Sequence, residues 1–260
     1  MPRPAHRGSA AQTLTMPLCE FLEWDSNFFG VRIGRVLGHR LSPETAPEVL
    51  VWCRDHEIDC LFFLADQEPE SIRAAEGLGF HLTDLRLTLE AQLNELKPGG
   101  ATTLPQVATV RGAALEDIPA LRRIAASSHT DSRFYQDGGF PRDRCDELFR
   151  IWVEKSCRGA ADAVLVAERD AQAAGYITCE VAGDRGRIGL VAVAEDARGT
   201  GLGHALLSHA LDWMFSRAVK VVSVVTQGRN LRAQRLYQAH GFANASLQLW
   251  YHLWPSTPNR

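Results

Sequence analysis

Residues 190–207 read LVAVAEDARGTGLGHALL, and this stretch decides the fold prediction. The apolar run 190–193 is typical of a buried strand, and 204–217 carries apolar residues at helical spacing. Between them lies the glycine loop 198–203, so a strand leads through glycines into the start of a helix. The free amides and partial positive charge of a helix N-terminus attract anions, and glycines let a large anion approach the backbone. The stretch therefore predicts a pyrophosphate-binding loop.

The loop does not fit two common phosphate-binding motifs. A Walker loop needs Gly-Lys-Ser/Thr at its end, and here Gly203 is followed by His204. A dinucleotide fingerprint, G-x-G-x-x-G, fails from both Gly199 and Gly201. The pattern that fits is Arg/Gln-x-x-Gly-x-Gly/Ala, present as RGTGLG over 198–203. It resembles the acetyl-CoA loop of the GNAT superfamily of N-acetyltransferases.

A second motif follows the glycine loop. The pattern predicts a strand, a helix and a last strand, over residues 219–225, 231–240 and 247–253. Asn230 stands at the start of the helix, Tyr237 lies near its end, and Gly241 terminates it. This segment resembles the second GNAT motif, in which the asparagine contacts the CoA arm and the tyrosine protonates the leaving thiolate. The resemblance makes Tyr237 the predicted general acid, because a neutral phenol can donate a proton to a thiolate.

The resemblance also implies where acetyl-CoA binds. The backbone of the strand before the loop pairs with the pantetheine amides, a strand-addition mode that needs no particular side chain. The predicted cofactor-binding residues are Leu190, Val191, Val193, Arg198, Gly199, Thr200, Gly201, Leu202, Gly203 and Asn230. We expect acetyl-CoA as cosubstrate and no metal.

Composition limits the class of protein. The 260 residues carry a net charge of −3 with no basic run, which argues against a general nucleic-acid binder. No stretch approaches 18 uninterrupted apolar residues, so no membrane helix is expected. Residues 1–16 lack the apolar core of a secretory signal. The six cysteines show no C-x-x-C spacing, so we expect buried free thiols in a cytoplasmic protein. The sequence is compatible with a homodimer.

The order of predicted elements divides the chain. Residues 1–15 are predicted as a disordered tail, 16–93 as an α/β unit, 94–106 as a linker and 107–260 as a GNAT domain. From 107 to 254 the predicted order is strand, two helices, three strands, helix, strand, helix, strand, which is the GNAT order. We therefore predict an α/β (α+β) GNAT fold with a central mixed twisted sheet flanked by helices.

The N-terminal unit carries a weak repeat. A short helix, Gly-Phe and an alternating strand occur at 72–89 and again at 234–253. The first copy has no comparable glycine loop. Two interpretations stay open: a degenerate half of the same fold that walls the substrate cleft, or a chance recurrence. Elsewhere we expect a turn at 25–30, a helix over 42–56 capped by its first residue, and a loop over 128–140.

Short pieces along nearly the whole chain narrow the resemblance to the dTDP-fucosamine acetyltransferase family. These pieces are Trp24, Phe28-Phe29-Gly30-Val31, Gly79-Phe80, Ser132-Arg133-Phe134, Trp152-Val153-Glu154, Arg158-Gly159, Gly175-Tyr176, Arg187-Ile188-Gly189-Leu190, Thr226-Gln227, Asn230 and Tyr237. That family acetylates the 4-amino group of dTDP-4-amino-4,6-dideoxygalactose. The resemblance implies a nucleotide-linked amino sugar as the acceptor.

The general base is less defined. Many GNAT enzymes carry a glutamate on the strand before the glycine loop, but residues 187–193 contain no carboxylate. Asp84 lies where the resembled family has a carboxylate proposed to act through waters, so it is the predicted base, with Glu180 as a second candidate. An alternating strand places Asp84 on one face with Leu82 and Arg86. A surface aspartate paired with arginine is therefore the alternative.

Two clusters are candidates for binding the acceptor. Arg133, Phe134 and Tyr135 could offer a cation to a diphosphate and rings to a base, or serve as a packed loop anchor. Thr226 and Gln227 end a strand beside the cleft, where they could hold pantetheine or sugar hydroxyls or form a turn.

Three functions follow from these readings. The first is an N-acetyltransferase for a nucleotide amino sugar, in which the amine attacks the thioester directly because neither motif places a Ser or Cys as acyl carrier. The second is acetyl transfer to another small-molecule or protein amine. The third is a non-catalytic acyl-CoA-binding module, against which the intact Tyr237 argues.

Overall fold

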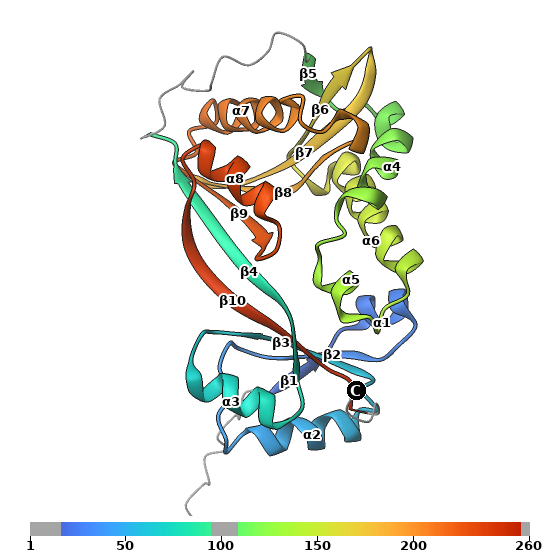
Figure 1. Ribbon diagram of the computed structural model, residues 1–260, viewed down its shortest axis with the longest axis vertical. Helices are drawn as coiled ribbons and strands as arrows, with labels where there is room; N and C mark the ends of the chain where they lie inside the picture. The colour runs from blue at the N-terminus through green and yellow to red at the C-terminus, as the bar shows by residue number, and fades with distance from the viewer. Residues whose placement is uncertain (1–16, 95–108, 256–260) are drawn as a thin grey trace, which may run out of the picture.

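The computed structural model describes residues 17–94 and 109–255. Within these residues the strands form one mixed sheet of ten, in the order β1-β2-β3-β10-β4-β9-β8-β7-β6-β5, with helices packed against it (Figure 1). The predicted mixed sheet flanked by helices is confirmed. The predicted tail at 1–15 and nearly all of the predicted linker at 94–106 lie outside the described residues.

The N-terminal half contributes four strands. Its elements are β1 (Cys19–Phe21), α1 (Glu23–Phe29), β2 (Ile33–Val36), α2 (Ala46–Asp55), β3 (Cys60–Ala65), α3 (Pro69–Gly77) and β4 (His81–Gln92). The expected turn at 25–30 is wrong, because α1 occupies it. Gly30 ends this helix in the left-handed region at φ 73°, and Phe29, the last residue of the helix, is buried.

The helix expected over 42–56 begins four residues late. α2 starts at Ala46 with Thr45 as its N-cap, so Ser42 does not cap it. Ser42 instead begins the turn that precedes the helix, in which its carbonyl accepts a hydrogen bond from the Ala46 amide at 2.9 Å. Pro47 takes the first-turn position that the sequence analysis gave to Pro43, because a proline there loses no intrahelical hydrogen bond.

The C-terminal half contributes the other six strands. Its elements are β5 (Thr109–Gly112), η1 (Leu115–Asp117), α4 (Ile118–Ser128), α5 (Arg133–Asp137), α6 (Arg142–Lys155), η2 (Ser156–Ala160), β6 (Ala163–Arg169), β7 (Gln172–Ala182), β8 (Arg185–Val193), η3 (Glu195–Ala197), α7 (Leu202–Phe215), β9 (Val221–Gln227), α8 (Leu231–Ala239) and β10 (Ala243–Leu253). The predicted order of strands and helices is confirmed. The expected loop over 128–140 is only partly right, because it contains α5, whose Phe134 is buried against other aromatic rings.

The two halves exchange strands at the centre of the sheet. In the N-terminal half, β2 pairs in parallel with β3, and α3 then leads into β4; in the C-terminal half, β8 pairs in parallel with β9, and α8 leads into β10. β4 pairs with β9, and β10 pairs with β3, so each half lends its strand to the other half. β4 and β10 then pair with each other. This arrangement supports the interpretation of the N-terminal half as a degenerate copy.

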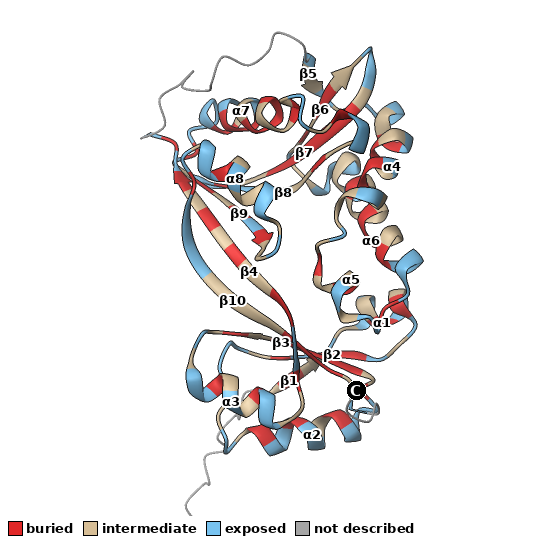
Figure 2. Cartoon of the chain, in the orientation of Figure 1, coloured by how far each residue is buried: buried red, intermediate tan, exposed pale blue. Residues whose placement is uncertain are grey.

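Three apolar clusters hold the helices to the sheet, and Figure 2 shows their buried residues along the central strands. One lies under α7, and another under α2 and α3. The third joins the halves, because Phe29 and Phe62 of the first half pack with Phe134 and Phe149 of the second. All six cysteines are unpaired and only Cys157 is not buried, as the sequence analysis predicted. No helix in 17–94 or 109–255 combines the length and apolarity needed to span a bilayer.

Candidate functional site

The sheet opens between β8 and β9. These strands pair in parallel only from Arg185–Val221 to Ile188–Val224. Beyond Ile188, β8 remains paired with β7, whereas β9 remains paired with β4 as far as Gln227. The peptide groups of residues 189–193 that face β9 therefore have no strand partner in the described chain. An extended ligand could add there as a strand, which is where the sequence analysis placed pantetheine at Leu190, Val191 and Val193.

A bulge lies where the strands separate. The register of β7 against β8 shifts between Ile177 and Cys179, and the Leu190 amide donates to Thr178 Oγ1 at 2.8 Å. A Cβ on Gly189 would lie 2.6 Å from the same oxygen, so only glycine fits at this position. A bulge bends its strand and increases the local twist, which accounts for the divergence of β8 from β9.

The glycine loop connects the open edge of β8 to α7. Gly199 and Gly201 lie in the left-handed region at φ 79° and 89°, which side chains disfavour. Arg198 Nε donates to the Val193 carbonyl at 3.3 Å, and Thr200 Oγ1 donates to the Ala197 carbonyl at 2.7 Å. These bonds fix the turn that brings the first amides of α7 next to the end of β8. Space is open above Gly199, where a Cβ would have no neighbour within 4 Å.

Tyr237 lies on α8 and belongs to the apolar cluster under α7. Its ring is 4% exposed and packs against Phe242 with the centroids 5.8 Å apart. Burial raises the pKa of the Tyr237 phenol above its usual value, so the group stays protonated at neutral pH. Its hydroxyl makes no hydrogen bond to a described residue. Asn230 has a structural role of its own, because its Oδ1 caps α8 by accepting from the Ala233 amide at 3.1 Å.

Thr226 and Gln227 end β9 on the side of β4. Thr226 is 3% exposed and lies opposite Leu87, and Gln227 lies opposite Arg86. The Gln227 carbonyl accepts from Gln234 Nε2 at 3.1 Å, which ties the strand end to α8. Both residues therefore stand next to the segment of β4 that carries Asp84.

Asp84 is a buried residue, so its interpretation as a surface aspartate is wrong. It is 5% exposed, and its Oδ1 accepts from the Leu85 amide at 2.8 Å and lies 3.8 Å from Arg229 Nε. Burial raises the pKa of the Asp84 carboxyl to about 6, against the opposing charges of Arg229 and Arg133. This value suits a general base near neutral pH. The second candidate, Glu180, is held in an ion pair with Arg187.

The structure gives the three residues 133–135 different environments. The Arg133 guanidinium carbon lies 4.0 Å from the Trp250 ring centroid, and Trp250 stands directly opposite Asp84. Arg133 and Asp84 are therefore neighbours on one face of the sheet. Phe134 is buried in the aromatic cluster, and the Tyr135 hydroxyl is bonded to Asp146. This geometry favours the anchor interpretation for both aromatic residues and leaves Arg133 facing the site.

Sequence reasoning missed four residues of this region: Arg229, Trp250, His252 and Asp137. Arg229 had a signal, because it immediately precedes Asn230 in the second motif. Trp250 and His252 lie on β10 and Asp137 on α5, and they meet only through the pairing of β10 with β4 and β3. No local pattern in the sequence marks them.

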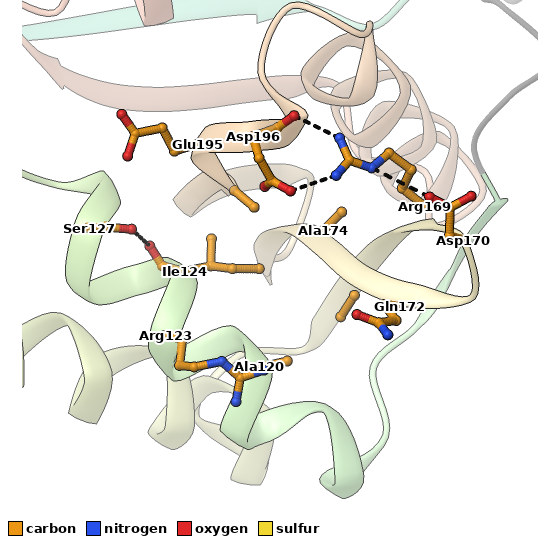
Figure 3. Close-up of a pocket in the computed structure, with 12 residues that line it drawn as sticks. Ala120, Arg123, Ile124, Ser127, Arg169, Asp170, Gln172, Ala174, Glu195 and Asp196 are labelled. Carbon is orange, nitrogen blue, oxygen red and sulfur yellow. Dashed lines mark hydrogen bonds and ion pairs between the residues drawn. The ribbon is translucent and has the colours of Figure 1, made fainter.

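A separate hollow opens between α4, the β6–β7 turn and η3 (Figure 3). Its lining residues include Arg123, Ser127, Arg169 and Asp196, and Arg169 is paired with Asp196 at 2.6 Å. None of the predicted cofactor or acceptor residues lines this hollow. Most of the predicted residues lie instead on β8, in the glycine loop, at the end of β9 and on the face of β4 and β10, whereas Phe134 and Tyr135 pack elsewhere.

Comparison with known proteins relates the chain to acetyltransferases. Residues 128–242 match the model of the acetyltransferase (GNAT) family. The chain is 27% identical to the dTDP-fucosamine acetyltransferase of Escherichia coli O6:H1 over 90% of its own length and 96% of that protein. It is 30% identical to the spore coat polysaccharide biosynthesis protein SpsD of Bacillus subtilis, over 54% of this chain and about half, 48%, of that one.

Solved structures share the fold at low identity. A GCN5-related N-acetyltransferase from Sphaerobacter thermophilus superposes with a TM-score of 0.64 at 15% identity, covering 90% of this chain and 75% of that one. A tandem GNAT protein from the clavulanic acid biosynthesis pathway superposes with a TM-score of 0.60 at 17% identity, covering 88% and 77%. Both have the GNAT fold that the sequence analysis predicted.

The raised pKa of Asp84 makes a prediction about stability. The unfolded chain ionises this carboxyl near pH 4, whereas the folded protein keeps it protonated to about pH 6. The free energy of unfolding therefore falls as the pH rises through this window, and Asp84→Asn escapes that loss. We expect Asp84→Asn to be more stable than wild type at pH 7 by on the order of 2 kcal/mol, and nearly equal to it at pH 4. Urea unfolding at both pH values measures the difference.

Asp117 is the matched control, because its hydrogen-bonded ion pair with Arg111 lowers the pKa of its carboxyl. Asp117→Asn should lose stability at pH 7, the opposite sign. An Asp84→Asn variant that is no more stable at pH 7 than at pH 4, relative to wild type, would show that the carboxyl is not perturbed by burial.

Proposed function

We propose that this chain, whose residues 128–242 match the acetyltransferase (GNAT) family, transfers the acetyl group of acetyl-CoA to an amino sugar linked to a nucleotide. The acceptor we propose is a dTDP-linked amino-dideoxy sugar, acetylated at the C4 amine. The observation that carries the proposal is the placement of Asp84, Trp250 and Arg133 together on the face of β4 and β10. The match to the E. coli dTDP-fucosamine acetyltransferase spans both halves of the chain and supports it.

Acetyl-CoA has a site of matching shape. The unpaired edge of β8 offers peptide groups to the pantetheine amides, and the amides at the start of α7 offer donors to the pyrophosphate. Arg198 stands at the start of the loop, and its Nε already donates a hydrogen bond to the Val193 carbonyl. The cosubstrate would therefore be held mainly by backbone groups.

The proposed reaction is direct transfer. The acceptor amine in its neutral form attacks the thioester carbonyl, a carbon–nitrogen bond forms, and the carbon–sulfur bond breaks. Asp84 takes the proton that leaves the nitrogen, directly or through a water, and Tyr237 gives a proton to the CoA thiolate. The raised pKa of Asp84, about 6, and the raised pKa of Tyr237 suit these opposite roles.

The glycine loop gives the first test. Gly201→Val adds a branched side chain at φ 89°, both straining the loop and filling the space the pyrophosphate needs. We expect calorimetry to show no measurable acetyl-CoA binding. Gly183→Val is the control, because Gly183 also has a positive φ, 61°, but lies in the β7–β8 turn with open space around it. Loss of affinity in both variants would trace the effect to backbone strain and not to the loop.

Tyr237 gives the second test. Tyr237→Phe keeps the buried ring and removes the proton donor, so kcat should fall about 10²-fold or more while the Kd for acetyl-CoA stays nearly constant. Tyr251→Phe is the control, because Tyr251 is equally buried but packs in the separate apolar cluster under α2 and α3. Steady-state thiol release measures both variants. A wild-type kcat in Tyr237→Phe would mean that another group protonates the thiolate.

The acceptor gives the third test. Thiol release is compared for dTDP-4-amino-4,6-dideoxygalactose, the free amino sugar, spermidine and an aminoglycoside. We expect the highest kcat/KM with the nucleotide sugar, because Arg133 and Arg229 can pair with its diphosphate. A higher kcat/KM with spermidine or the aminoglycoside would overturn the acceptor and leave the acetyltransferase assignment standing. The absence of turnover with every amine would instead favour an acyl-CoA-binding module.

A further inference from the structure

One imidazole joins the two ends of α5 beneath the proposed acceptor site. Arg133 opens this helix and Asp137 ends it, four residues later, so both side chains reach the same neighbour on β10. Arg133 Nη1 lies 3.1 Å from His252 Nε2, and Asp137 Oδ2 lies 2.6 Å from His252 Nδ1. His252 itself is fully buried, opposite Phe62 of β3.

The partners fix the state of the imidazole. A guanidinium only donates hydrogen bonds, so His252 Nε2 accepts and Nδ1 carries the proton that is donated to Asp137. Burial lowers the pKa of His252 to about 4, so the ring is neutral at neutral pH. Asp137 accepts a second bond from Trp254 Nε1 at 3.0 Å. The carboxylate is thus held by two neutral donors, and through the ring it orients Arg133.

The Arg133 guanidinium packs against aromatic rings and forms no direct ion pair with a described carboxylate. The centroids of Trp250, Phe134 and Phe62 lie 4.0, 4.2 and 4.4 Å from its central carbon. No carboxylate oxygen of a described residue lies within 4.0 Å of its nitrogens. Burial lowers the pKa of the Arg133 guanidinium to about 10, and the more distant charges of Asp25, Asp84 and Asp137 oppose this shift.

A guanidinium has five N–H donors, and in the described chain the bond to His252 uses one. Arg133 as a whole residue is only partly buried. A charge kept in an aromatic setting with free donors is costly unless a ligand pairs with it. A phosphate or diphosphate group is the ligand that matches a planar set of donors.

We propose that His252 and Asp137 are positioning residues that hold Arg133 against Trp250 to bind the diphosphate of the acceptor, an inference that rests on the proposed function. The position fits such an acceptor, because Arg133 is a neighbour of the proposed base Asp84. In a nucleotide sugar, one pyranose ring separates the C4 amine from the diphosphate. The cation that takes the phosphate must therefore lie close to the group that takes the proton of the amine.

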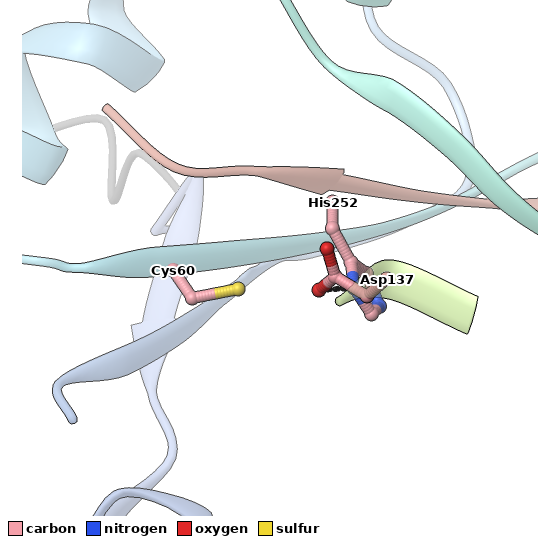
Figure 4. Close-up of side chains that lie close together, drawn as sticks. All are labelled: Cys60, Asp137 and His252. Atoms are coloured by element: carbon pink, nitrogen blue, oxygen red, sulfur yellow. Dashed lines mark hydrogen bonds and ion pairs between the residues drawn. The ribbon is translucent and has the colours of Figure 1, made fainter. Parts of the chain in front are cut away.

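The same cluster contains a thiol, which raises a competing interpretation. Cys60 Sγ, an Asp137 oxygen and a His252 nitrogen lie within 4.8 Å of one another (Figure 4). These are ligand types that zinc binds. The Arg133 charge at His252 Nε2 opposes a cation there, and burial raises the pKa of the Cys60 thiol, which disfavours the thiolate. Zinc binding at this cluster is therefore the alternative to the positioning role.

The experiment compares His252→Gln with His252→Asn. Glutamine can place an acceptor near the Nε2 position and keep the contact to Arg133, whereas asparagine reaches only Asp137. We expect His252→Asn to raise KM for the dTDP amino sugar at least about tenfold, and His252→Gln to raise it less than about threefold. Arg133→Met should match His252→Asn. KM for the methyl glycoside of the same amino sugar and KM for acetyl-CoA should change less than twofold in all three variants, and their thermal midpoints should stay close to that of wild type.

Each other outcome has a meaning. Equal losses on the nucleotide sugar and the methyl glycoside would show that the Asp137–His252 pair is merely structural and overturn the inference. Stoichiometric zinc in the purified protein, absent from Cys60→Ala, would replace it with a metal site. If wild type acetylates no nucleotide sugar, the proposed function fails, and calorimetry with dTDP decides this inference separately. Binding of dTDP that is kept in His252→Gln and lost in His252→Asn upholds it, and absence of binding overturns it.

Discussion

The pairing of β4 with both β9 and β10 is the constraint on which the rest of this structure depends. It inserts a strand of the N-terminal half into the middle of the sheet, so neither half can bury its apolar strands without the other. Without β4, β9 and β10 would each present an unpaired edge, which a folded domain tolerates poorly. The same pairing sets Asp84 opposite Trp250 and places Leu87 and Arg86 beside the end of β9. Architecture and site are therefore fixed by one register.

Beyond Ile188, β8 and β9 no longer form hydrogen bonds to each other, which leaves an open edge on β8. The bulge at Gly189 and Leu190 diverts β8 after Ile188, and the peptide groups that face β9 then need partners other than a strand, as the Val193 carbonyl finds in Arg198. In the loop, the glycines at 199 and 201 adopt positive φ angles and keep side chains away from the first amides of α7. The proposed cofactor side of the site is thus a property of backbone conformation, which explains why a short sequence motif is enough to predict it.

Features that depend on local sequence could be predicted, whereas features that depend on contacts between distant segments could not. The loop, the strands and the longer helices follow local patterns, and these were placed within a few residues. The two missed helices, α1 and α5, have seven and five residues, too few to be stable by propensity. They exist because they pack on each other, with the rings of Phe29 and Phe134 5.3 Å apart. Alternation along β4 gave the face of Asp84 but could not show that α5 covers it. Arg133 and His252 are 119 residues apart in the chain, so only the fold brings them together.

The N-terminal half has no glycine loop of its own, but it contributes residues to the proposed acceptor site. Phe62 and Asp84 come from it, whereas Arg133, Trp250 and His252 come from the C-terminal half, and they share one face of the sheet. Asp84 is kept there although its burial costs stability at neutral pH. Proteins retain such costs where a site needs the group, and the cost here falls on the residue proposed to take the proton of the amine. An N-terminal half that has no glycine loop would thus supply the proposed base and one wall of the proposed acceptor site, and strand exchange is what inserts both into the common sheet.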